Sequence, residues 1–293
     1  MSDGADPPPP GIGRFLEIQN LGLNLPFALA FLLLAADGWP TVRTTVLVVV
    51  AFVAARNAGH SFNRWADRAL DAQNPRTRGR ALVTGRLSAE FAVTMAAANA
   101  AILVGAAYLI NPLASVLAPV ALALVFGYSY TKRVTAFTTA FLGLVEAVTP
   151  AAVYIAVTGA LPVAVLLAVG ALLAWGTAFE TVHSLGDLAS DRALGLFSVP
   201  LALGERVSVR LVAVLHAVAL LLLAGFGVAL GLAVPYFVGL LAMAALAAAT
   251  DVALAARPTD ARIPFERHFA LGAIFLAGVV LAVLVPATAA LRP

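Results

Sequence analysis

The chain has 293 residues, of which 62% are apolar and 11% are charged. Soluble domains are less apolar, at about 45–50%, so this composition excludes an ordinary soluble protein. There is no cysteine, which excludes disulfides and thiol chemistry, and the net charge of +3 gives no reason to expect a nucleic-acid partner.

The N-terminal segment, residues 1–13, is acidic and rich in proline. It lacks the basic start of a signal peptide, and we expect a disordered tail. Residues 14–293 are expected to form one transmembrane domain.

Long runs without charge define the predicted elements. Residues 91–131 and 211–250 contain no Asp, Glu, Lys or Arg, and each run is long enough for two spans of about 20 residues. Turn-forming residues divide the runs at Asn111-Pro112 and at 231–235. The sequence predicts an all-α membrane protein, a polytopic bundle of nine transmembrane helices. The predicted spans are 16–36, 43–62, 89–110, 113–131, 136–158, 161–181, 207–230, 232–255 and 268–290.

The first predicted helix carries Glu17, Asn20 and Asn24 at i, i+3 and i+7, which places them on one face. They either line a cavity or bond to other helices.

The first long inner connection, residues 63–88, contains Asn63, Asp67 and Asp71 at four-residue spacing. If the preceding helix continues past residue 62, all three lie on one face. Further along the chain stands Lys132, the single lysine, which either binds phosphate or anchors a helix end.

The second long inner connection, residues 182–206, contains Asp187 and Asp191, also four residues apart. The letters DRAL at 67–70 recur at 191–194 and suggest two related halves. At that offset Asn63 corresponds to Asp187, and Asp67 to Asp191.

Clustered carboxylates repel one another unless cations neutralise them. Mg²⁺ takes oxygen ligands, commonly one or two carboxylates together with phosphate oxygens, so Mg²⁺ is the predicted cofactor and a diphosphate the predicted ligand. The alternative is that the aspartates form salt bridges with arginines within the loop helices. Zinc is disfavoured because there is no cysteine and His60 and His183 lack ligand spacing. Further phosphate donors are expected among Arg76, Arg78, Arg80, Lys132 and Arg133.

Basic residues are distributed unequally over the predicted topology. One side holds 16 of the 18, and the other holds only Arg43 and Arg292. By the positive-inside rule, the N-terminus and the two long loops are cytoplasmic and the C-terminus is outside. A prokaryotic cell membrane or an inner organelle membrane is expected.

Four other polar residues fall in or near the spans. Glu146 is either functional, as intramembrane acids are by default, or close enough to the interface to be solvated. His216 is expected to be a helix contact, and Asp251 and Asp260 to lie near the interfacial end of the eighth helix.

Three motifs in order resemble the UbiA family of intramembrane prenyltransferases. They are N-x-x-x-D-x-x-x-D at Asn63, Asp67 and Asp71, Y-x-x-x-K at Tyr128 and Lys132, and D-x-x-x-D at Asp187 and Asp191. The run NPRTRGRAL is similar to the 4-hydroxybenzoate polyprenyltransferase branch. The chain departs from the family at Ala81, Glu180 and His183, where proline, aspartate and tyrosine are frequent.

The resemblance implies Mg²⁺-dependent transfer of an isoprenyl chain from a polyprenyl diphosphate to an aromatic acceptor such as 4-hydroxybenzoate, in quinone biosynthesis. It implies a helical bundle around a central cavity capped by the cytoplasmic loops, and a lipid-embedded enzyme with no obligate protein partner. The implied metal ligands are Asn63, Asp67, Asp71, Asp187 and Asp191. The implied catalytic residues are these four aspartates and Lys132. The implied substrate-binding residues are Asn63, Arg76, Arg80, Tyr128, Lys132 and Arg133, with Arg133 for an acceptor carboxylate. Asp191 is the candidate base, and the candidate aromatic faces for a carbocation are Tyr128, Tyr130, Tyr154, Phe62 and Phe179.

Other functions stay open at this point. The same chemistry on a naphthoate-type menaquinone precursor, or on another lipid or tetrapyrrole acceptor, fits the same motifs. A transporter would also place acids in a helical bundle, but with charges near the midplane and broken helices there.

Overall fold

The computed structural model describes residues 15–260 and 262–284, and every regular element in these ranges is a helix. The long helices are α2 (Leu21–Ala35), α3 (Val42–Ala66), α5 (Ala89–Ile110), α6 (Pro112–Thr131), α7 (Thr138–Thr158), α8 (Val165–Gly186), α11 (Glu205–Ala229), α12 (Val234–Ala256) and α13 (Arg262–Leu284). Short helices in the connections are η1 (Ile18–Asn20), α4 (Arg68–Asp71), α9 (Leu188–Ala193) and α10 (Val199–Leu203). The predicted all-α bundle is confirmed, while the predicted tail at residues 1–13 lies outside the described residues.

Among the described helices, eight are long and apolar enough to cross a membrane, and α2, with 15 residues, is shorter. At 1.5 Å per residue α2 rises about 22 Å, less than the ~30 Å hydrocarbon core. The sequence predicted a ninth full span here, over 16–36. Its polar start instead forms the separate turn η1, so the helix proper begins at Leu21.

Two helices end closer to the acidic motifs than the sequence predicted. Helix α3 continues to Ala66 and α8 to Gly186, beyond the predicted ends at 62 and 181. The polar residues that suggested an earlier end face an internal cavity, so they do not break the helix. Helix α13 begins earlier than predicted, and the predicted residues 285–290 lie outside the described part of the chain.

Turn chemistry explains two of the short connections. The Asn111 side chain accepts a hydrogen bond from the Ala114 amide at 2.8 Å, which caps α6, and Pro112 occupies its first turn. Gly231 has a φ of 63° in the turn between α11 and α12.

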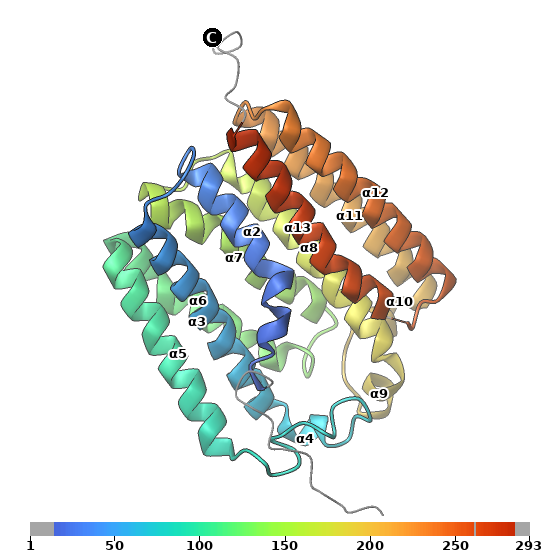
Figure 1. The fold of residues 1–293 in the computed structure, drawn as a ribbon. Helices are drawn as coiled ribbons and strands as arrows, with labels where there is room; N and C mark the ends of the chain where they lie inside the picture. Colours follow the sequence, from blue (N-terminus) through green and yellow to red (C-terminus); the bar gives the residue numbers. More distant parts are fainter. Residues whose placement is uncertain (1–14, 261, 285–293) are drawn as a thin grey trace, which may run out of the picture.

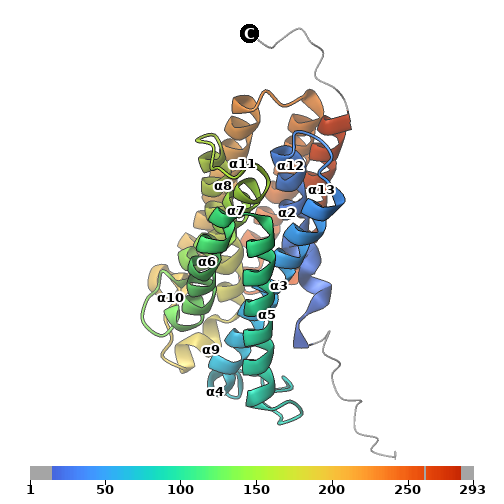
Figure 2. The ribbon, with the colours of Figure 1, turned by 90° about the vertical axis from the view of Figure 1, so that its left-hand side faces the viewer.

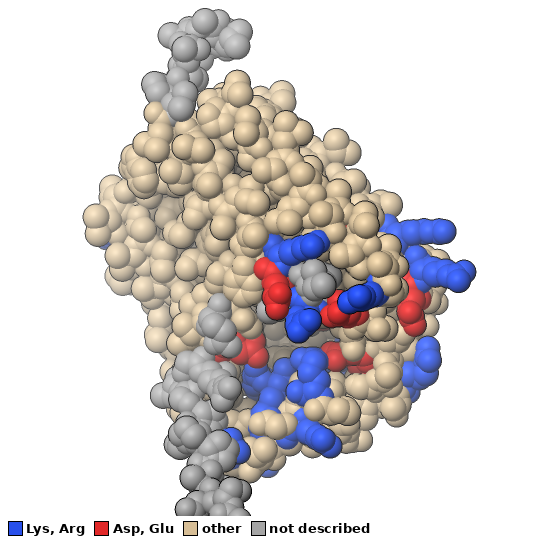
Figure 3. All heavy atoms as spheres, turned by 45° about the vertical axis from the view of Figure 1, so that its right-hand side comes forward, with Lys and Arg blue, Asp and Glu red and all other residues tan. Residues whose placement is uncertain are grey.

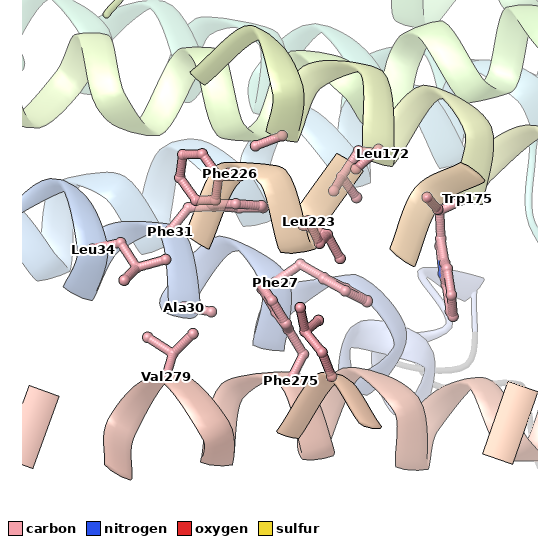
Figure 4. Close-up of a cluster of buried hydrophobic side chains, with 14 of the residues drawn as sticks. Phe27, Ala30, Phe31, Leu34, Leu172, Trp175, Leu223, Phe226, Phe275 and Val279 are labelled. Atoms are coloured by element: carbon pink, nitrogen blue, oxygen red, sulfur yellow. The ribbon is translucent and has the colours of Figure 1, made fainter. Parts of the chain in front are cut away.

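The helices form one bundle in which α2 lies between α3 and α13 (Figure 1). An aromatic core joins α2, α8, α11 and α13 (Figure 4). In it the Phe27 and Phe275 rings lie 5.4 Å apart, and Phe31 packs against Phe226 at 6.1 Å. Aromatic side chains therefore fill this half of the bundle, and the cavity lies in the other half, among α3, α5, α6 and α7.

The short helices α4 and α9 lie at the same end of the bundle (Figures 1 and 2). Charged side chains gather around a hollow at this end, while the rest of the visible surface is almost free of charge (Figure 3).

Candidate active site

The first acidic motif lies where α3 passes into α4. Asn63 is in the last turn of α3, Asp67 is at the break, and Asp71 ends α4. Backbone bonds of 2.8 Å run from Asp67 N to Asn63 O and from Asp71 N to Asp67 O. Because the i+4 pattern crosses the break, the three side chains stay on one face, and all three line the cavity.

Basic groups already hold these carboxylates. Asp67, 2% exposed, accepts from Lys132 Nζ at 2.6 Å and from an Arg133 nitrogen at 2.9 Å. One Arg80 nitrogen lies 2.7 Å from each oxygen of Asp71. The Asn63 amide donates to Asp67 at 3.0 Å.

The second acidic motif lies where α8 passes into α9, and Arg76 connects it to the first loop. Arg76 donates from Nε to Asp187 Oδ1 at 2.9 Å and from a terminal nitrogen to Oδ2 at 2.5 Å. Burial would raise the pKa of Asp187, but the Arg76 hydrogen bonds and charge outweigh it and lower that pKa. The hydrogen bonds with Asp187 in turn raise the pKa of Arg76. This bidentate pair joins the two long loops across the cavity mouth.

Asp191 lies close to Asp187 and forms no ion pair of its own with any described residue. Burial, and then the negative charge of Asp187, raise the pKa of Asp191 to about 6. The second motif therefore combines a firmly ionised carboxylate with one that titrates near neutrality.

The geometry corrects the predicted correspondence between the two halves. Asp67 and Asp187 each lie at the break between a long and a short helix, with φ of −92° and −98°. Asp71 and Asp191 follow four residues later. The equivalent pairs are thus Asp67 with Asp187 and Asp71 with Asp191, because the backbone break, and not the DRAL letters, fixes the positions.

Tyr128 and Lys132 are one turn apart at the end of α6. The Tyr128 hydroxyl donates to Glu180 on α8 at 2.6 Å, and Lys132 reaches Asp67 on α3. This last turn of α6 therefore contacts both helices that carry the acidic motifs.

A cavity of about 780 Å³ extends from the acidic residues into the bundle. Its mouth is lined by Asp67, Asp71, Asp187 and Asp191 with Arg76, Arg80 and Lys132. Its inner walls are apolar and come mainly from α3, α5, α6 and α7, for example Phe52, Leu103, Leu117, Leu124 and Val148.

A polar strip follows the α2 side of this cavity. Glu17, Asn20 and Asn24 all line the cavity, which is the first of the two predicted alternatives. They also form bonds with neighbouring residues. Glu17 forms an ion pair with Arg64, and Asn24 donates to Glu146 at 2.8 Å. Burial would raise the pKa of Glu17, but the Arg64 guanidinium is the main group that lowers it below its usual value.

Other predicted residues lie elsewhere. Arg133 is outside the cavity lining, where it donates to Asp67 and to the Ala66 carbonyl and lies 5.1 Å from the Tyr130 ring centre. Arg78 is exposed and also does not line the cavity.

Of the five candidate aromatic faces, only Tyr128 and Phe179 line the cavity. Phe62 packs on Phe126, with ring centres 4.5 Å apart, and Tyr154 is buried in the core. Plain helix packing accounts for both, because each ring is held by other apolar side chains.

Among the polar residues that line the cavity, Arg56, His60 and Asn74 were not predicted as site residues. Arg56 and His60 precede Asn63 by seven and three residues, so helical spacing places them on its face. The spacing is visible in the sequence, but the positive-inside rule by itself accounts for an arginine at position 56. His216 bonds to Asp251 at 2.8 Å and does not line the cavity, so the prediction of a helix contact is confirmed.

The donor set suits a hard divalent cation. Within the described ranges, no three His, Cys, Asp or Glu side chains converge closely enough to hold a metal alone. Pairs of carboxylates on each side of one cavity, with the Asn63 amide, leave coordination positions for phosphate oxygens, as Mg²⁺ requires. The residues present therefore fit a magnesium–diphosphate complex.

Fold and site together define an integral membrane protein whose cavity matches an amphiphile with an anionic head and a long apolar tail. A family model, the UbiA prenyltransferase family, matches residues 24–274. The chain belongs to this family and is a prenyltransferase.

Known relatives agree with this assignment. The 4-hydroxybenzoate octaprenyltransferase of Alkalilimnicola ehrlichii is 34% identical over 73% of this chain and 72% of its own. A UbiA homolog from Aeropyrum pernix, solved without ligand, is 31% identical with a TM-score of 0.82, covering 90% of this chain and 98% of its own. A UbiA homolog from Archaeoglobus fulgidus, solved with GPP and Mg²⁺, shares the fold at 20% identity and a TM-score of 0.72, covering 93% and 99%.

Proposed function

We propose that the protein transfers a polyprenyl chain from its diphosphate to an aromatic acceptor such as 4-hydroxybenzoate, in quinone biosynthesis. One observation carries the proposal: a single cavity joins both acidic motifs to a long apolar wall. A polyprenyl tail loses about 0.8 kcal/mol per CH₂ on leaving lipid, so a binding site within the membrane suits it.

The diphosphate binds at the mouth. Asn63, Asp67, Asp71, Asp187 and Asp191 would hold Mg²⁺, which supplies positive charge to the leaving diphosphate and so promotes cleavage of the allylic C–O bond. Arg76, Arg80 and Lys132 now rest on the same carboxylates, so each is in place to donate to phosphate oxygens instead. Tyr128 presents its ring beside the reacting carbon, where a developing cation gains from an aromatic face.

The acceptor binds deeper, against the polar strip of α2 and α3. Several relatives at 31–34% identity are named 4-hydroxybenzoate octaprenyltransferases, which supports this acceptor. Arg56 lines the cavity and Arg133 does not, so Arg56 is the better partner for an acceptor carboxylate. Ring attack then forms the new C–C bond, and the ring proton is lost to a nearby carboxylate, for which Asp191 is suited.

The proposal extends to residues 14–293 as one catalytic domain that needs no protein partner. The mouth of the cavity faces the cytoplasm, because the basic residues cluster at that end.

Product formation tests the proposal. Purified protein in lipid nanodiscs is incubated with Mg²⁺, geranyl diphosphate and 4-hydroxybenzoate, and the C-prenylated acid is sought by mass spectrometry. We expect product with Mg²⁺, none with excess EDTA, and none from the Asp67→Asn, Asp187→Asn double variant. Absence of product from the unchanged protein with any prenyl diphosphate would overturn the acceptor assignment, and full activity of the double variant would overturn the metal assignment.

A further inference from the structure

Glu146 is an acid in the cavity wall that belongs to neither acidic motif. It lies eight residues into α7 from Thr138, about 12 Å along the helix axis. Arg56 lies seven residues from Asn63 along α3, about 10 Å from the mouth. Both side chains line the cavity, so a carboxylate and a guanidinium occur at similar depth.

The Glu146 carboxylate is held in a fixed position. Its Oε1 accepts from Asn24 Nδ2 at 2.8 Å. Its stem lies against Gly176 of α8, where an added Cβ would come within 2.9 Å of Glu146 Cγ. Two neighbouring helices thus orient this side chain, which favours a role that depends on direction.

One oxygen of this carboxylate is left for a ligand. Among the residues that the structure describes, Oε2 has no hydrogen-bond partner and no ion pair reaches Glu146. Arg56 instead donates to the Leu16 and Glu17 carbonyls at 2.8 and 3.2 Å. A carboxylate withdrawn from bulk water requires hydrogen-bond donors, and a hydroxyl on a bound ring would supply one.

We propose that Glu146 is a specificity-determining residue that accepts a hydrogen bond from the hydroxyl of the aromatic acceptor, while Arg56 binds the acceptor carboxylate. This inference rests on the proposed function and makes it more specific. A hydrogen bond to an ionised oxygen is roughly twice as strong as a neutral one. An acceptor without the hydroxyl leaves the carboxylate unpaired, so the site rejects it.

The competing role for Glu146 is structural, as a link between α2 and α7. The Glu146→Gln variant separates the two roles. The amide oxygen still accepts from Asn24, which preserves the link between the helices. The amide nitrogen then faces the cavity as a donor, where the native protein presents an acceptor.

The test measures binding of three ligands: 4-hydroxybenzoate, benzoate and 4-methoxybenzoate. Isothermal titration uses protein in nanodiscs with Mg²⁺ and a non-reactive thiolo analogue of geranyl diphosphate. We expect the native protein to prefer 4-hydroxybenzoate over benzoate by about 10- to 100-fold, the range of one hydrogen bond to a charged group. In Glu146→Gln this ratio should fall below about threefold, 4-methoxybenzoate should gain relative to 4-hydroxybenzoate, and benzoate affinity should stay nearly constant.

Asp251→Asn is the matched control, because Asp251 is another intramembrane acid with one partner, His216, and does not line the cavity. It should keep the native ratio. An unchanged affinity for benzoate shows that the Glu146→Gln variant is folded. If this variant does not fold, Asn24→Ala is used instead. It removes the hydrogen bond that orients the Glu146 carboxylate, so it should lower the ratio of 4-hydroxybenzoate to benzoate affinity. A native ratio that persists in the variants would overturn the role of Glu146 alone, whereas failure of the native protein to bind any of the three acids would overturn the proposed acceptor and this inference with it.

Discussion

At the residue scale, Arg76 is the side chain on which the two loops converge. Its guanidinium makes two bonds to Asp187, and lysine cannot reproduce this two-pronged geometry. We predict that Arg76→Lys raises the KM for the prenyl diphosphate about tenfold and leaves the KM for the acceptor nearly unchanged, because only the diphosphate binds at the mouth. Steady-state kinetics with each substrate varied in turn measure both constants.

Arg78→Lys is the control for this change. Arg78 belongs to the same loop but is exposed and does not line the cavity. Equal effects of the two substitutions would show that loop charge, and not the Arg76–Asp187 pair, sets donor affinity.

Asp191 gives a prediction on pH. Its pKa is raised to about 6, so the carboxyl takes up a proton as the pH falls through that value, whereas Asp187, with a lowered pKa, stays ionised. Because a metal ligand must be deprotonated, the Mg²⁺ concentration for half-maximal activity should rise below pH 6 by up to about tenfold per pH unit and level off above pH 7. Titration of activity with Mg²⁺ between pH 5 and 8 measures this, and a constant requirement would exclude Asp191 as a ligand.

At the element scale, the α7–α8 contact sets the position of Glu146 and Glu180. Gly143 faces the α8 backbone, where an added Cβ would lie 2.9 Å from Thr177 N. Gly143→Ala should therefore force the helices apart and destabilise the protein by about 1–3 kcal/mol. Thermal unfolding in detergent, followed by size-exclusion chromatography, measures the loss.

Gly105→Ala serves as the comparison, since Gly105 is also helical but has open space around its Cβ position. It should be neutral or stabilising by about 0.4–1 kcal/mol. A similar loss in both variants would mean that glycine content, and not the close approach of α7 and α8, governs the effect.

The helices themselves were largely predictable, because apolar runs and turn residues such as Asn111 and Gly231 mark where they begin and end. Their ends near the motifs were not. Asn63 and His183 lower the local hydropathy and suggest a loop, yet both continue a helix because they face the cavity. Hydropathy cannot distinguish a polar residue at the membrane surface from one that lines an internal space.

At the scale of the whole molecule, the sequence predicted which charged residues gather but not how they pair. Spacing indicated the two acidic motifs. The structure adds that Arg76 bridges the two loops and that Arg133 donates to Asp67 from outside the cavity. Contacts such as Asn24 with Glu146, 122 residues apart, depend on how helices are placed beside each other, which local patterns do not encode. The same holds for the aromatic candidates, since no sequence motif distinguishes Phe62 from Phe179 and, of these two, only Phe179 lines the cavity.

The orientation in the membrane is a property of the whole chain, and the lack of cysteine makes it directly measurable. Trp39, 69% exposed, lies in the connection between α2 and α3, and Arg78 is exposed in the loop at the opposite, charged end. With 16 of 18 basic residues on the side of Arg78, that side should be cytoplasmic. We predict that an impermeant maleimide labels Trp39→Cys in intact spheroplasts and labels Arg78→Cys only after permeabilisation, while the parent protein stays unlabelled. The reverse pattern would place the cavity mouth on the outer face, where cytoplasmic diphosphates could not reach it, and would therefore contradict both the orientation and the proposed source of the donor.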